Sequence, residues 1–66
     1  MSQDSIVSAL SEIQPQFRAV VVLVDIGDFT YADAAQILDV PIGTVMSRLH
    51  RGRRALKQKL AEDALT

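Results

Sequence analysis

The chain has 66 residues, no cysteine and a formal net charge of −1, so it forms one small domain that disulfide bonds and thiolate metal sites do not stabilise. The apolar run "AVVVLV" is far shorter than the roughly 20 residues of a membrane span, and the N-terminus lacks the basic start and apolar block of a signal peptide. A soluble, intracellular protein is therefore expected.

The first predicted helix covers residues 4–13. Its apolar residues recur at helical spacing, at Ile6, Val7, Leu10 and Ile13. Gln14-Pro15 ends this helix, because proline lacks a backbone donor and restricts the residue before it. Pro15 also suits the first turn of a following helix.

The second predicted helix covers residues 16–26, although its composition is ambiguous. Its valines are β-branched and favour a strand. A helix is nevertheless expected, because the chain offers no second strand and the apolar residues follow the i, i+3, i+4, i+7 pattern, at Phe17, Val20, Val21 and Val24. Gly27-Asp28 ends the helix. Val22 and Leu23 project away from this stripe, so they are expected to meet the first helix or a partner protein.

The remaining two helices are predicted at residues 31–38 and 42–61. Thr30 followed by Asp33 fits a capping box at the start of the shorter helix. Asp39-Val40-Pro41 is a tight connection between the two. Two helices joined by about three residues, the second of them basic, are typical of a helix-turn-helix. The expected fold is therefore all-α, a four-helix domain with a C-terminal helix-turn-helix.

Charge is divided unevenly between the two parts of the chain. Residues 1–40 hold six acids and one base, a net charge of −5, whereas residues 41–66 hold six bases and two acids, a net charge of +4. Four of the seven cationic residues fall within "PIGTVMSRLHRGRR". This asymmetry suggests a basic binding element on an acidic body, and the local distribution says more about nucleic-acid binding than the overall charge does.

An angular plot of the last helix separates an apolar side from a polar one. With about 100° per residue, five apolar residues fall within a wedge of roughly 60°, the expected core side. These are Ile42, Val45, Leu49, Leu56 and Leu60. The opposite side gathers hydrogen-bond donors at Thr44, Ser47, Arg51, Arg54 and Gln58, with Arg48 and His50 flanking it. Since a major groove admits one α-helix and an arginine fork can hold guanine O6 and N7 together, this side is a candidate DNA-binding face, with a solvated face as the alternative.

Four residues of this helix fit the division less well. Arg53 falls on the core side, where its head can pair with an acid of the body or a phosphate. Met46 lies at the core boundary, so core filling and a groove contact are both open. His50 is a candidate groove-edge contact, with plain exposure as the alternative. Gly52 costs roughly 1 kcal/mol against alanine, which the close approach of another helix would explain.

The stretch "FTYADAAQILDVPIGTVMSRLHRGRRAL" resembles region 4, the C-terminal promoter-recognition domain, of bacterial sigma factors of the extracytoplasmic-function group. "GTVMSRLHRGRR" is close to the signature of that group, and "LSEIQPQFRAVVVLVDIGDFTYADAAQIL" matches the usual start of the domain. The resemblance covers nearly the whole chain, from about Ile6 to Leu60.

The resemblance implies a protein of the bacterial cytoplasm that binds the −35 promoter element through its last two helices, with no cofactor or metal. It also implies docking on the flap of the RNA polymerase β subunit and sequestration by an anti-sigma factor. Nothing in the chain corresponds to region 2, which binds and melts the −10 element, so residues 1–66 look like a single region 4 domain from a longer sigma factor.

Two sets of functional residues are expected. The DNA-binding residues are Thr44, Met46, Ser47, Arg48, His50, Arg51 and Arg54. An exposed apolar groove for a polymerase or anti-sigma helix is expected at Ile6, Val7, Leu10, Val22 and Leu23. Three positions depart from the family pattern: Met46 replaces a frequent Lys or Arg, Asp39 a usual Gly with left-handed backbone, and Ala34 a larger aliphatic residue.

Other functions remain open from the sequence. A response-regulator output domain is also a four-helix helix-turn-helix, but it would dimerise through its last helix, where Leu56 and Leu60 continue the core stripe. A protein-interaction module would set the arginine face against an acidic partner. An enzyme is not expected, because the chain has no nucleophile–base pair, metal-ligand set or glycine-rich phosphate loop.

Overall fold

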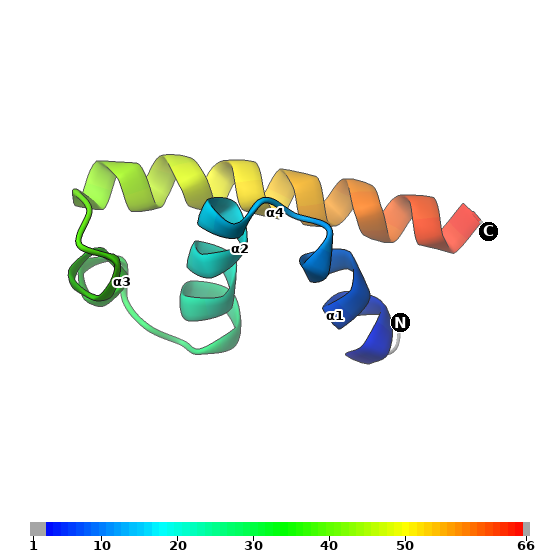
Figure 1. The fold of residues 1–66 in the computed structure, drawn as a ribbon, viewed down its shortest axis with the longest axis horizontal. Coiled ribbons are helices and arrows are strands. Elements are labelled where there is room, and N and C mark those ends of the chain that lie inside the picture. Colours follow the sequence, from blue (N-terminus) through cyan, green and yellow to red (C-terminus); the bar gives the residue numbers. More distant parts are fainter. Residues whose placement is uncertain (1–2, 66) are drawn as a thin grey trace.

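A computed structural model describes residues 3–65, and the regular structure in this range is entirely helical (Figure 1). Four α-helices follow one another, α1 (Gln3–Ser11), α2 (Pro15–Val21), α3 (Tyr31–Leu38) and α4 (Ile42–Leu65), and a π-helical turn, η1 (Val22–Ile26), extends α2. The prediction of an all-α domain is confirmed for these residues. None of the helices in this range is long and apolar enough to cross a membrane.

The long helix α4 organises the molecule. It runs along the longest dimension of 38 Å, and α1, α2 and α3 pack against it (Figure 1). The helix α3 lies beneath the N-terminal end of α4, α2 beneath its middle and α1 beneath its C-terminal half. The first turns of α4 therefore reach beyond α2 and lie over α3 (Figure 1).

A short corner joins α1 to α2. The helix α1 ends at Ser11, earlier than the sequence pattern indicated, and Ile13 lies in the turn with its side chain 5% exposed. Pro15 is the first residue of α2. The backbone N–H that proline lacks would have no acceptor within the helix at this position, so no hydrogen bond is lost. Arg18 donates a hydrogen bond to the Ser11 carbonyl across the corner at 3.3 Å, so the turn is closed from the α2 side.

The segment expected as one helix over residues 16–26 has two hydrogen-bond registers. After α2 the chain widens into η1, where the Gly27 N–H donates to the Val22 carbonyl at 2.8 Å, five residues back. Val20 and Val21 are fully buried, so tertiary packing overrides their preference for a strand. Residues in this wider turn follow one another at a smaller angle than the roughly 100° of an α-helix. The residues after it therefore face other directions than an α-helical pattern predicts.

The third helix and its connection follow the local chemistry of the sequence. The Thr30 hydroxyl accepts a hydrogen bond from the Asp33 N–H at 3.0 Å, which caps the first turn of α3. Asp39 ends the helix with a left-handed backbone at φ 56 and ψ 50. The Pro41 carbonyl then accepts from the Thr44 and Val45 N–H groups at 2.9 and 3.2 Å and starts α4. This connection fixes the short turn of the helix-turn-helix.

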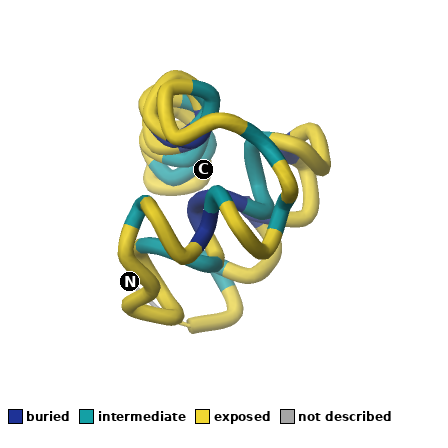
Figure 2. Tube along the Cα trace, turned by 90° about the vertical axis from the view of Figure 1, so that its left-hand side faces the viewer, coloured by how far each residue is buried: buried dark blue, intermediate teal, exposed yellow. Residues whose placement is uncertain are grey.

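The core forms where the other helices face α4 (Figure 2). All four α-helices and the α1–α2 corner contribute buried apolar residues, namely Ala9, Leu10, Ile13, Val20, Val21, Ala34, Val45 and Leu49. Ala34 is fully buried, and its small side chain lets α3 come close to its neighbours. The described residues include no buried charged group, so apolar packing rather than a buried ion pair holds α4 against the other helices.

Candidate nucleic-acid interface

The first half of α4 presents a polar, cationic face to solvent. Ser47, His50, Arg51 and Arg54 are exposed, whereas Thr44 and Arg48 are half-buried at its margins. Met46 is 53% exposed, which fits its predicted place at the core boundary and leaves both of its roles, partial core filling and a groove contact, as predictions. Six of the seven side chains expected to bind DNA therefore lie on one surface of α4 or at its margins. The seventh, Met46, lies at the edge of this surface beside His50.

The orientation of α4 differs from the angular plot. Val45 and Leu49 are 0% and 2% exposed and Gly52 is buried, so the buried side is centred between these three. Ile42 is 50% exposed, and its prediction as a core residue is wrong. An apolar plot overlooks Gly52, although the missing side chain is what lets α2 cover that side of the helix.

The rotated orientation changes which donors point straight out. With about 100° per residue, Ser47 and Arg54 lie almost opposite the buried centre. His50 and Arg51 flank them by roughly 50° on either side. The central exposed donor is therefore Arg54, and Arg51 lies on the shoulder that faces α2.

Arg51 is held on this shoulder by an aromatic ring. Its guanidinium carbon lies 5.9 Å from the centre of the Phe17 ring in α2, within the range of a cation–π contact. Such a contact restricts the arginine side chain while its donors still face solvent. Phe17 was predicted as part of the core stripe, and its contact with Arg51 was not predicted, because this contact depends on where α2 crosses α4.

The arginines of α4 differ in their ionic partners. Among the described residues, Arg48, Arg51 and Arg54 form no ion pair, so their charge is open to a ligand. Arg53 instead forms two hydrogen bonds with Asp25 of η1, at 2.9 Å from Nε and 2.6 Å from the terminal nitrogen. This pairing confirms the expectation that Arg53 meets an acid of the body.

The pair shifts the titration of both partners. The hydrogen bonds from Arg53 hold the pKa of Asp25 below its ordinary value of 3.8, and burial opposes them only in part. The same bonds raise the pKa of Arg53, with a smaller contribution from Tyr31 at the start of α3. The pair therefore stays ionised at neutral pH and connects η1 to α4.

Gly52 marks the closest approach of α2 to α4. A Cβ at this position would lie 2.6 Å from Val21 Cγ2 and 2.8 Å from the Phe17 carbonyl oxygen. The expectation that a neighbouring helix explains this glycine is confirmed. The contact sets the distance between α4 and the body at the middle of the cationic face.

The apolar residues expected to dock a partner are not equivalent in the structure. Val7 and Val22 are 59% and 40% exposed, whereas Ile6 and Leu23 are half-buried against the core. Leu10 is 7% exposed and belongs to the core, because α1 turns this side chain inward, so its expected place in an exposed groove is corrected. Exposed apolar side chains that the sequence analysis did not single out include Ile26, Phe29 and Ile37.

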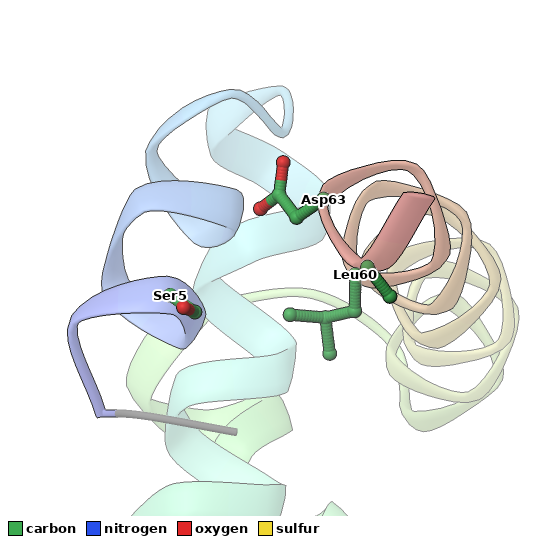
Figure 3. A pocket seen from close by; sticks show the side chains of 4 residues that line it. Ser5, Leu60 and Asp63 are labelled. Atoms are coloured by element: carbon green, nitrogen blue, oxygen red, sulfur yellow. The ribbon is translucent and has the colours of Figure 1, made fainter. Parts of the chain in front are cut away.

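Two further features lie outside this face. A pocket of about 290 Å³ opens between α1 and the C-terminal part of α4, lined by Ser5, Leu60, Asp63 and Ala64 (Figure 3). Its α4 residues, Leu60, Asp63 and Ala64, lie near the C-terminal end of that helix, away from the helix-turn-helix. In the part of the chain that the structure describes, no group of three His, Cys, Asp or Glu residues could hold a metal ion.

Comparisons with known proteins agree with the helix-turn-helix geometry. Residues 3–56 match the family described as sigma-70, region 4. The chain is 47% identical over 55 residues to the ECF RNA polymerase sigma factor SigE of Mycolicibacterium smegmatis, covering 83% of this chain and 21% of that protein. It is 34% identical over 59 residues to the ECF RNA polymerase sigma factor SigW of Bacillus subtilis, covering 89% of this chain and 32% of that protein. The chain thus spans between a fifth and a third of these relatives, and it belongs to the sigma-70 region 4 family.

Proposed function

We propose that the chain is the −35 recognition domain of an extracytoplasmic-function sigma factor, which directs RNA polymerase to promoters in the bacterial cytoplasm. The observation that carries the proposal is the exposed face on the first half of α4, where three arginines that form no ion pair with any described residue follow a helix-turn-helix turn. Family membership and the two sigma-factor relatives support it. The activity is binding, and it requires no catalytic group or cofactor.

In this proposal α4 enters the major groove with its first turns. Thr44 and Ser47, near the helix N-terminus, bind phosphate or base edges, where the helix dipole favours an anion. Arg51 reads a guanine through O6 and N7, and its cation–π contact with Phe17 helps to orient the guanidinium group. Arg54 points straight out but lies three residues further than Arg51 from the N-terminal turns that enter the groove, so we assign it, together with Arg48, to phosphates.

Two residues add contacts that a purely cationic face would lack. Met46 offers an exposed apolar side chain that suits a thymine methyl group. His50 lies on the flank beside it and donates at the groove edge. Since Met46 stands where the family often has a cation, we expect the preferred −35 sequence to differ from that of relatives with Lys or Arg there.

Selection of bound duplexes from a random pool tests the proposal. The expected result is one enriched motif that contains a guanine and whose affinity falls as salt rises. A pool that shows no enrichment, with binding to acidic proteins instead, would support the alternative of a protein-interaction module. A palindromic motif bound by two copies of the chain would support a response-regulator output domain.

A second proposed surface binds the transcription machinery. We assign to it the exposed Val7 and Val22, together with the half-buried Ile6 and Leu23. Its proposed occupant is an apolar helix of the RNA polymerase β flap, and an anti-sigma factor would compete for the same residues. Exposed apolar side chains of this kind commonly mark protein-binding sites.

A further inference from the structure

Arg53 differs from the other arginines of α4 because its fork is occupied. Asp25 accepts from Nε and from the terminal nitrogen at 2.9 and 2.6 Å, through two separate carboxylate oxygens. Guanidinium groups bind phosphate oxygens with the same two-bond geometry. The carboxylate of Asp25 therefore occupies the donors that Arg53 would offer to a DNA backbone.

The ion pair is not needed to hold α4 in place. The two side chains remain 51% and 34% exposed, and an ion pair in contact with water contributes little to stability. Packing already fixes α4 nearby, since Val45 and Leu49 are buried and Gly52 lies against α2. Stability alone therefore does not explain why Asp25 and Arg53 face each other.

The position of Arg53 on α4 suits a phosphate contact. It lies about 100° around the helix from Arg54, on the flank of the exposed face. An α-helix with side chains is about 10–12 Å across and the major groove about 12 Å wide, so the flanks of a helix in the groove lie next to the phosphate backbones. An unpaired arginine on this flank would reach them.

The backbone at Asp25 is also unusual. Asp25 is the fourth residue of η1, and π-helical turns are rare and frequent at functional sites. The turn presents this one carboxylate to α4, whereas Asp28, three residues later, forms no ion pair with any described residue. Of these two neighbouring acids, only Asp25 neutralises a cation of α4.

We propose that Asp25 withholds Arg53 from DNA phosphates, which lowers the affinity of the domain for DNA of every sequence and leaves its discrimination between sequences, a ratio of affinities, unchanged. The inference rests on the proposed DNA-binding function. A phosphate contact strengthens binding to all sequences alike, because it releases counterions wherever the protein sits. Withholding one such contact therefore weakens binding to the selected site and to its competitors by the same factor.

The test compares Asp25→Asn with the control Asp28→Asn. Both substitutions remove one negative charge, and asparagine tolerates the left-handed backbone of Asp28, at φ 58. Binding is measured by fluorescence anisotropy on a selected duplex and on a random-sequence duplex. As salt rises from about 50 to about 200 mM, the affinity of Asp25→Asn should fall by a factor about 3.5 times larger than that of the wild type, because the variant makes one additional phosphate contact. The control should keep the wild-type salt dependence.

Arg53→Gln provides a second readout that does not depend on the folding of Asp25→Asn. If Asp25 withholds Arg53, removing the arginine leaves the salt dependence of binding unchanged, and the double variant Asp25→Asn/Arg53→Gln also returns to it. A weaker salt dependence in Arg53→Gln would mean that Arg53 already binds phosphate, which overturns the inference.

The experiment also separates the inference from the function on which it rests. Selective binding by the wild type, combined with an unchanged salt dependence in Asp25→Asn, overturns the inference alone. A wild-type chain that binds no DNA selectively overturns the proposed function and the inference with it.

Discussion

Replacing Gly52 with alanine tests the packing that presents the cationic face. Intrinsic helix propensity predicts that Gly52→Ala stabilises the domain by about 1 kcal/mol. The structure predicts the opposite sign, because the new Cβ would lie 2.6 Å from Val21 Cγ2 and 2.8 Å from the Phe17 carbonyl oxygen. The valine methyl can shift, but the carbonyl belongs to the backbone of α2 and moves only with that helix.

The size of the effect follows from these two opposing contributions. Overpacking a tight contact costs about 1–3 kcal/mol, and a backbone neighbour places the cost in the upper part of that range. Subtracting the gain in helix propensity leaves a net destabilisation of about 1–2 kcal/mol. For a domain of this size, that corresponds to a fall in Tm of about 4–16 °C.

The assay is thermal unfolding followed by circular dichroism, with Gly43→Ala as the matched control. Gly43 lies in the same helix, and a Cβ there would meet nothing within 4 Å. The control should therefore unfold at the wild-type temperature or above it. If Gly52→Ala is as stable as Gly43→Ala, α2 does not approach α4 as closely as the structure indicates and the reasoning is refuted.

The remaining predictions concern DNA binding, pH and partner binding. Arg51→Ala should cost about 1–3 kcal/mol at one base position, measured with single-base variants of the selected site, and an equal loss on all sequences would reassign it to phosphate. Arg54→Ala should weaken binding to all sequences and reduce the salt slope by about 1, whereas a loss at one base alone would make it a base reader. The lowered pKa of Asp25 means that its exposed pair with Arg53 adds a small stabilisation that is present above pH 3.8 and is lost as pH falls through that lowered pKa. The small Tm difference between wild type and Asp25→Asn should therefore shrink in acid, and a constant difference would contradict this assignment. Val22→Glu should weaken capture of RNA polymerase core while the dichroism spectrum stays that of the wild type, and unchanged capture would remove Val22 from the docking surface.

Local chemistry made the helix-turn-helix predictable from the sequence. The hydroxyl of Thr30 and the left-handed Asp39 determine where α3 begins and ends, and both are readable from residue type and spacing. Arg53 was also predictable as a paired residue, since a cation on the apolar side of a helix needs a partner. Its partner was not, because the η1 turn decides which acid faces α4.

The errors share a physical cause, which is that long-range packing decides between faces of similar composition. Ile42 fits the apolar stripe of α4, but this stripe ignores Gly52, the residue that lets α2 approach. Leu10 was predicted as an exposed partner contact, yet the structure buries it, and Leu23, which stays in the proposed docking surface, is half-buried against the core. Leu23→Glu would therefore damage folding, which makes the exposed Val22 the better probe of docking.

Methylation interference on the selected duplex tests the central claim, that α4 reads bases from the major groove. Methyl groups on guanine N7 lie in the major groove, at the atom that the Arg51 fork is proposed to hold. Methylation of one guanine within the site should block the wild-type chain, and it should no longer matter to Arg51→Ala, whose binding is already weakened. A site at which no N7 methylation interferes, or at which only minor-groove methylation of adenine does, would contradict the account.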